Sequence, residues 1–312
     1  MSVATVLPTI GGRPTPSARS GRLPLWSIRQ AERAPLRATT PREEFYASIV
    51  DQLTPSSTSS TSSVVGLGTG DLVAGLIRHV SVATPTADIV FRPLSQSTTE
   101  ELKLHNLPIA DHTTAVLDVV VDQADQVDTS DARGEVWWVV GRDENGPQVS
   151  QVDVQALKST IYGNETAKVI VLTRCLEDGR LRGTLPVMID GDELEWEEVA
   201  EEVDDLFVTD AEITRRSNQE AANTRGFPDP VIVENADGSS SMTLDVAFFE
   251  EFKLFGQESA YRDIENEVEG IEGVLAAGLV GVSRDRRVVV WRVADAGGGD
   301  DDDAFEVTGV VA

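Results

Sequence analysis

A glycine-rich turn is the first segment of the chain whose residues could bind a ligand. Residues 66–70 read Gly-Leu-Gly-Thr-Gly and join a predicted buried strand, Val64–Leu67, to a predicted helix, Asp71–Val80. Such a turn points backbone N–H groups and a helix N-terminus at one spot, which attracts a phosphate. The third glycine of a dinucleotide-binding turn is missing, because Asp71 stands in its place. A tight turn without a ligand needs glycines too, so both interpretations stay open.

Two further polar clusters lie beside predicted strands and helices. Asp122 and Asp125 follow the apolar run Ala115–Val121, and ligands of open α/β sheets sit beyond the carboxyl ends of strands. Two carboxylates there could bind sugar hydroxyls or relay protons, and a plain acidic loop is the alternative. The stretch Ser95–Leu102 is rich in hydroxyls, which could bind an oxyanion or simply cap the helix predicted over Thr98–Leu104.

Short Val-rich runs alternate with helical patterns up to residue 172. The predicted strands are Val64–Leu67, Asp88–Phe91, Ala115–Val121, Val136–Val140 and Val169–Leu172. The predicted helices are Pro41–Leu53, Asp71–Val80, Thr98–Leu104 and Val152–Ser159. Strands that alternate with helices are typical of a parallel sheet covered on both faces. We therefore expect a doubly wound, mostly parallel, Rossmann-like α/β domain.

The pattern changes after residue 184. The following elements are predicted in the order strand, helix, strand, strand, helix, strand, over Leu185–Ile189, Glu193–Leu206, Pro230–Glu234, Ser241–Val246, Tyr261–Glu269 and Gly273–Val282. This order is ferredoxin-like. It predicts a smaller α+β domain, 185–274, inserted into a larger one made of 43–184 and 275–294.

Both ends of the chain differ from the rest. Residues 1–42 carry seven arginines, six prolines and a single acid, which predicts a disordered basic extension; a basic arm that binds a partner is the alternative. Residues 295–312 contain a run of three glycines and four aspartates and are expected to form an acidic tail.

The chain as a whole is strongly acidic, with 53 acidic and 26 basic residues and a formal net charge of −27. We expect no nucleic-acid partner, because the phosphates would be repelled. Only four of the basic residues are lysines. A lysine-poor acidic chain suits a cytoplasm at molar salt, where the screening length falls to about 3 Å. We expect a halophilic, cytoplasmic protein of haloarchaeal origin, with an acidic protein from a low-salt organism as the alternative.

The sequence contains no pattern that predicts a metal site or a membrane span. Cys175 is the single cysteine, and His79, His105 and His112 have no zinc-binding spacing. No apolar run approaches the roughly 20 residues that cross a bilayer. We expect no metal, no cofactor and no membrane contact.

Taken in order, the polar segments resemble the type A family of ribose-5-phosphate isomerases. The resemblance covers about 43–293 and rests on the order of six segments: 66–70, Ser95–Leu102, Asp122–Asp125, Gly183–Val187, Asn235–Val246 and Glu265–Val274. It implies conversion of ribose 5-phosphate to ribulose 5-phosphate, in which a carboxylate moves a proton between C1 and C2 through an enediolate. It implies that Asp122 and Asp125 hold sugar hydroxyls and help ring opening. The residues taken to bind substrate are Gly68, Thr69, Gly70, Asp71, Ser95, Ser97, Thr98, Thr99 and Arg142.

The sequence departs from the family pattern around the phosphate. Asp71 and Leu72 replace the two hydroxyl residues that meet the phosphate in the family. A carboxylate beside a phosphate is repulsive. Arg180 and Arg182 are the candidates to replace a later lysine that faces the phosphate in the family.

The segment that supplies the base departs as well. The family's Lys-Gly-Gly-Gly segment has no copy, and 141–146 takes its place, with Arg142 near the position of the lysine. The count to the family's base glutamate reaches Gln151, which cannot abstract a proton. Glu144, a carboxylate of the segment 141–146, joins Asp122 and Asp125 as a candidate catalytic residue.

Three functions are compatible with these observations. The first is an active ribose-5-phosphate isomerase with a remodelled site. The second is a catalytically inactive relative that binds a sugar phosphate or a protein partner. A different reaction on the same scaffold, such as acyl or CoA transfer, is a third. The expected partner is a small sugar phosphate, and assembly into a homo-oligomer is left open.

Overall fold

The computed structural model describes most of the chain after residue 40. The described residues are 41–53, 62–83, 88–110, 116–142, 151–177, 179–191, 196–207, 210–218, 229–234, 239–295 and 305–311. The predicted basic extension, 1–42, lies outside them apart from the first residues of α1 (Pro41–Leu53).

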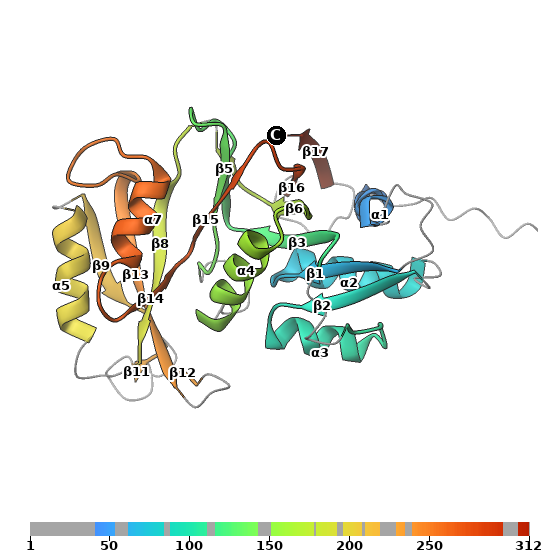
Figure 1. The fold of residues 1–312 in the computed structure, drawn as a ribbon, viewed down its shortest axis with the longest axis horizontal. Helices are drawn as coiled ribbons and strands as arrows, with labels where there is room; N and C mark the ends of the chain where they lie inside the picture. The colour runs from blue at the N-terminus through green and yellow to red at the C-terminus, as the bar shows by residue number, and fades with distance from the viewer. Residues whose placement is uncertain are drawn as a thin grey trace, which may run out of the picture. The chain divides into compact units, whose positions relative to one another are not determined.

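A six-stranded sheet combines four strands from residues 63–173 with two strands from residues 288–311 (Figure 1). Its strands lie in the order β17 (Phe305–Val311), β16 (Val288–Asp295), β6 (Lys168–Thr173), β3 (Val119–Ala124), β1 (Ser63–Leu67) and β2 (Ile89–Pro93). Neighbours from β16 to β2 are parallel, and β17 runs antiparallel at the edge. The predicted mixed α/β fold with a mostly parallel sheet is confirmed. β17 lies in the stretch that we expected to be an acidic tail.

Both faces of this sheet are buried, because successive side chains of each strand enter different cores. Val119 and Val121 of β3 pack in the core that contains α1, α2 (Asp71–Ala83) and Leu102 of α3 (Gln96–Leu104). Val120 points to the other face and packs with α4 (Gln151–Gly163). Strands buried on both faces read as continuous apolar runs, which explains the Val-rich pattern.

A second, four-stranded sheet shares the core of α4. Its order is β15 (Leu279–Ser283), β5 (Glu135–Val139), β4 (Gln126–Asp128) and β7 (Leu176–Glu177). β5 covers all but the last residue of the run Val136–Val140, which we predicted as a strand of the parallel sheet. That prediction is wrong, because β5 pairs antiparallel with β4 and β15. The few residues between β4 and β5 allow a hairpin, whereas a parallel crossover needs about a dozen.

The third sheet has the predicted ferredoxin-like order. Its elements along the chain are β8 (Arg182–Asp190), α5 (Trp196–Phe207), β9 (Ala211–Arg215), β13 (Ser240–Glu251), α7 (Tyr261–Glu269) and β14 (Val274–Ala277). In space the strands lie in the order β14, β8, β13, β9, and each neighbouring pair is antiparallel. Both helices pack on the face that carries Leu185 and Leu244. The domain boundary at 185–274 stays a prediction.

Two strands of this region differ from their predictions. The second strand is β9 and not Pro230–Glu234, whose residues fall into β11 (Asp229–Pro230) and β12 (Val233–Glu234). β11 pairs with β10 (Ser217–Asn218) in a two-stranded sheet, and β12 pairs with the start of β13. The predicted strand Gly273–Val282 is in fact two strands, β14 and β15, separated by Gly278.

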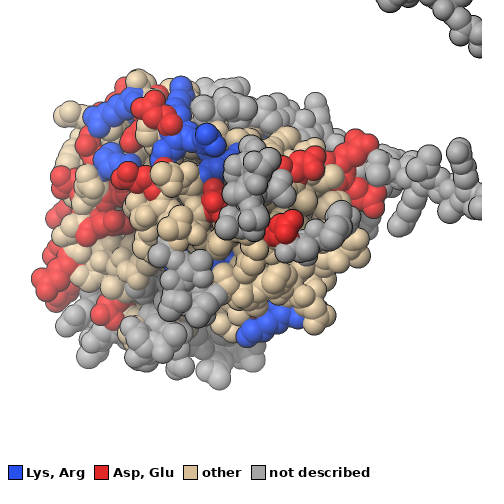
Figure 2. Space-filling model, turned by 45° about the vertical axis from the view of Figure 1, so that its right-hand side comes forward, with Lys and Arg blue, Asp and Glu red and all other residues tan. Residues whose placement is uncertain are grey.

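Surface charge and helix length add two observations. Acidic side chains are spread across the face drawn in Figure 2, whereas basic side chains gather mainly in one area of it. In the part of the chain that the structure describes, none of the helices combines the length and the apolar character of a membrane span.

Candidate active site

The glycine turn brings the end of β1 against the end of β3. The Gly68 N–H donates to the Val121 carbonyl oxygen at 2.8 Å. A Cβ atom on Gly68 would lie 2.0 Å from Oδ1 of Asp122, so no larger residue fits there without moving that carboxyl. Gly70 has a φ of 116°, a conformation that other residues rarely adopt. Both glycines are therefore required by this turn and its close approach.

Asp122 is a buried carboxyl at the carboxyl end of a parallel strand. It lies within β3, although we expected it in the following turn, and it is 1% exposed. Burial raises its pKa to about 7 and the charge of Asp125 adds to the rise, while hydrogen bonds from Trp138 and from the backbone of Gln123 and Thr69 oppose it. Trp138 Nε1 donates at 3.3 Å to Oδ2. A carboxyl with this pKa can both accept and donate a proton near neutral pH.

Asp122 faces a small hollow with a second carboxylate on its wall. The hollow has an open volume of about 10 Å³, roughly the space of one water molecule. Its polar lining comes from Thr69, Ser95, Asp122 and Asp153. Asp153 lies in the first turn of α4, two residues after Gln151, the position that corresponds to the family's base glutamate. Sequence reasoning missed it, and the signal that could have found it is an acid in the first turn of the helix after β5.

A larger cavity of about 560 Å³ adjoins the hollow at Thr69, which lines both. It lies between α2 and α3, and a volume of this size is typical of small-molecule sites. The predicted residues Thr69, Gly70, Asp71, Ser97 and Thr98 line it. Its apolar wall is formed by Ala74, Ile77 and Leu104.

The hydroxyl-rich loop mainly holds the N-terminus of α3 in place. Ser95 caps the helix by accepting the Thr98 N–H at 3.0 Å, and Thr99 Oγ1 donates to the Ser95 carbonyl. Thr98 Oγ1 donates to the carbonyl oxygen of Gly68, which fixes α3 to the glycine turn. Ser97 Oγ lies 3.3 Å from Thr69 Oγ1. The structure thus brings the loop beside the turn, as predicted, with several of its hydroxyls used internally.

Asp71 is paired where the family pattern places a hydroxyl. Arg174 donates two hydrogen bonds to its carboxylate, and Gln123 Nε2 donates a third. Neither Arg174 nor Gln123 was predicted as a site residue. An arginine directly after a parallel strand is the signal in the sequence that could have identified Arg174.

Two of the other predicted residues, Asp125 and Arg142, line neither cavity. Asp125 accepts the Arg142 N–H at 2.9 Å. The Arg142 guanidinium donates to the Thr184 and Arg182 carbonyl oxygens, which connects the segment after β5 to β8. Glu144 lies outside the described residues.

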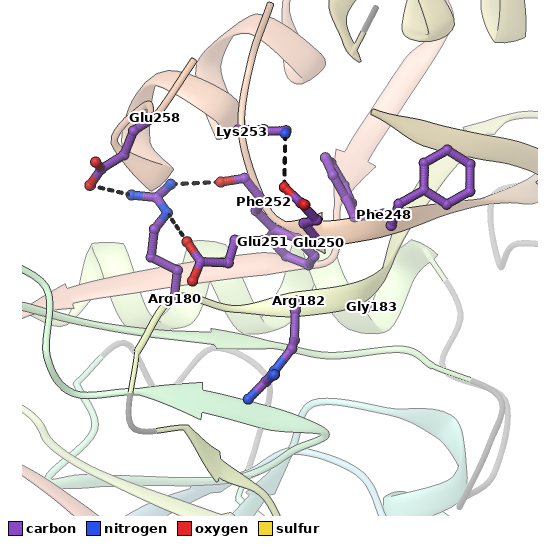
Figure 3. A pocket seen from close by; sticks show the side chains of 10 residues that line it. Arg180, Arg182, Gly183, Phe248, Glu250, Glu251, Phe252, Lys253 and Glu258 are labelled. Atoms are coloured by element: carbon purple, nitrogen blue, oxygen red, sulfur yellow. Dashed lines mark hydrogen bonds and ion pairs between the residues drawn. The ribbon is translucent and has the colours of Figure 1, made fainter. Parts of the chain in front are cut away.

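Arg180 and Arg182 line a different cavity, of about 800 Å³, on β8 and β13 (Figure 3). Arg180 pairs with Glu251 and Glu258, and Lys253 pairs with Glu250, so the charges there are matched within the chain. Arg182 pairs with Glu177 of β7. In the structure, Arg174 and not these two arginines stands beside the glycine turn.

The described residues include no cluster of three histidine, cysteine or acidic side chains arranged to hold a metal ion. The polar groups at the turn and its cavity are carboxyls, hydroxyls, the Gln123 amide and the guanidinium groups of Arg174 and Arg78. Such groups can bind hydroxyls, bind an anion and transfer protons.

Comparison with known proteins gives matches among solved structures. No protein-family model and no curated protein matches the sequence. The fold is similar to ribose 5-phosphate isomerase A from Methanocaldococcus jannaschii, with a TM-score of 0.57 and 16% identity over 86% of this chain and 97% of that one. The isomerase from Plasmodium falciparum gives 0.61 and 14% over 87% and 97%, and isomerase A from Neisseria gonorrhoeae gives 0.54 and 17% over 85% and 95%. At these identities the likeness establishes the fold.

Proposed function

We propose that the chain is a ribose-5-phosphate isomerase-like enzyme, which interconverts ribose 5-phosphate and ribulose 5-phosphate. The observation that carries the proposal is the buried carboxyl of Asp122, with a pKa of about 7, beside a second carboxylate, Asp153. Two carboxyls in different environments are a common arrangement for acid and base roles. The fold shared with three solved isomerases supports the same reaction class by analogy.

In the proposed mechanism the walls of the hollow, which has room for about one water molecule in this structure, move apart to admit C1 and C2 of the open-chain aldose. The Asp153 carboxylate removes the proton from C2, the C1 carbonyl electrons move to its oxygen, and an enediolate forms. The protonated Asp122 carboxyl donates to that oxygen, which stabilises the developing negative charge. Asp153 then returns the proton to C1, the O2 proton is released to Asp122, and ketose results.

The phosphate of the substrate is assigned to the larger cavity. Thr69 joins this cavity to the hollow, so one molecule can reach both. The donors that line this cavity are the hydroxyls of Thr69 and Ser97 and the guanidinium of Arg78, beside the carboxylates of Glu100 and Glu101. The guanidinium of Arg174 pairs with Asp71 of the same wall. Asp125 and Arg142 then support the strand end and do not touch substrate in this assignment.

The test is the formation of ribulose 5-phosphate by purified protein in molar KCl. We expect Asp122→Asn and Asp153→Asn each to lower kcat about 10²- to 10⁴-fold, the usual range for loss of a general acid or base. Asp263→Asn is the matched control, because it removes one exposed carboxylate that pairs with Arg133 elsewhere. No turnover by the wild type would favour the inactive relative, and full activity of Asp153→Asn would refute its role as base.

A further inference from the structure

The N-terminus of α2 is already occupied by a carboxylate of the chain itself. Arg174 Nη1 lies 2.9 Å from Oδ1 of Asp71, and Nη2 lies 2.5 Å from Oδ2. Gln123 Nε2 donates to Oδ1 at 2.9 Å. Asp71 lines the larger cavity beside Thr69 and Gly70, so the ion pair holds Arg174 next to a residue of the cavity wall.

The backbone donors of the same helix end are also engaged. Gln123 Oε1 accepts the Leu72 N–H at 2.7 Å. The Asp71 side chain accepts the N–H of its own residue. A helix N-terminus attracts an anion through unsatisfied N–H groups of its first turn. Two of these groups already have acceptors from within the chain.

Asp71 carries its charge at neutral pH. Burial raises the pKa of this carboxyl, but the hydrogen bonds from Arg174 and Gln123 outweigh burial and hold the pKa below its ordinary value. A phosphate at this turn therefore meets a negative charge and a guanidinium that is already paired.

We propose that Asp71 is an intramolecular competitor for the phosphate of the substrate. In the empty site it occupies Arg174, and a phosphorylated sugar binds by taking Arg174 from it. Arg174 is then the residue that recognises the phosphate, and Asp71 sets how tightly. This inference rests on the proposed function, since it concerns the phosphate end of that substrate.

The exposure of the pair makes such an exchange feasible. The Arg174 side chain is 33% exposed and the Asp71 side chain 41% exposed, so water screens the attraction between them. A phosphate dianion carries more charge than a carboxylate and fits the planar guanidinium equally well. The dianion therefore displaces the Asp71 carboxylate from the Arg174 guanidinium once its local concentration is high enough.

The kinetic test uses Asp71→Asn, which keeps the size of the side chain and removes the charge. We expect the KM for ribose 5-phosphate to fall about tenfold, the order of magnitude for one charge repulsion near a protein surface, with kcat within about twofold. Arg174→Gln should raise KM by at least about tenfold by the same reasoning. Asp263→Asn, which changes the net charge equally, should leave KM unchanged. An unchanged or higher KM for Asp71→Asn overturns the proposal.

Inorganic phosphate separates this inference from the proposed function. A ligand that binds only the folded state raises the melting temperature. We expect inorganic phosphate to raise the melting temperature of Asp71→Asn more than that of the wild type. In Asp71→Asn/Arg174→Gln this additional rise should be absent. That result supports the competitor even if the wild type shows no isomerase activity. Equal shifts in all three proteins overturn it. Circular dichroism checks folding, and Asp71→Ser repeats both measurements if Asp71→Asn does not fold.

Discussion

Replacing Asp122 by asparagine should stabilise the protein more at pH 8 than at pH 5. The carboxyl has a pKa of about 7 in the folded protein and an ordinary value of 3.8. Since folding raises the pKa, the folded state holds the proton more tightly than the unfolded chain. The stability that comes from this group is therefore complete below pH 4, falls as the pH rises to about 7, and is constant above that.

The size of the effect follows from the two pKa values. One pH unit of differential protonation corresponds to about 1.4 kcal/mol, and about two such units separate pH 5 from the folded pKa. The wild type should thus lose about 3 kcal/mol between pH 5 and pH 8 through Asp122. Asparagine does not titrate, so the variant avoids this loss. If the asparagine variant loses a hydrogen bond from the backbone of Thr69 or Gln123, its stability falls equally at both pH values.

The assay is urea unfolding of both proteins at pH 5 and pH 8. All other titratable groups are common to the two proteins, so they cancel when the free energies of unfolding are subtracted. The free energy of unfolding of the variant minus that of the wild type should be about 3 kcal/mol larger at pH 8 than at pH 5. If the difference is the same at both pH values, Asp122 does not titrate in this range, and its assignment as proton donor is wrong.

Three further predictions concern packing, buried charge and salt. Gly68→Ala places a methyl group 2.0 Å from the Asp122 carboxyl, so we expect loss of activity and about 1–3 kcal/mol of destabilisation in urea unfolding. Lys158→Met removes one of two cationic partners of buried Glu265, which keeps Arg262 2.8 Å away, and should destabilise by about 1.5–3 kcal/mol at pH 7, with part of the loss recovered in Lys158→Met/Glu265→Gln. With a net charge of −27, the melting temperature should rise with KCl between about 0.1 and 1 M, and a flat profile would contradict the role of self-repulsion.

The first half of the fold was largely predictable from the sequence. α1 begins and ends where Pro41–Leu53 was predicted, because a proline in the first turn and the following serine-rich stretch mark its ends. The glycine turn was placed between a strand and a helix, and the structure has it between β1 and α2. These features depend on local chemistry, which the sequence shows directly.

The errors concern long-range pairing. Val136–Val140 reads like any buried strand, and nothing local says which sheet receives it. β9 is a short edge strand with alternating burial among polar residues, so its pattern was weaker than that of Pro230–Glu234. The site partners Asp153 and Arg174 were missed for the same reason, because each meets the turn only through the packing of distant elements.

Gly278 joins two sheets through a single backbone. Its N–H donates to Pro186 of β8, and its carbonyl accepts the N–H of Val140, directly beyond β5. On one side of it β14 pairs with β8, and on the other Val280 of β15 is paired with Trp138. Gly278 thus connects the third sheet to the strand pair that carries Trp138, the donor to the buried carboxyl of Asp122. A Cβ atom at Gly278 would lie 2.4 Å from the Val140 oxygen and would force the backbone there to shift. We expect this shift to change the position of Trp138 and thereby its hydrogen bond to Asp122, although Gly278 lines neither cavity.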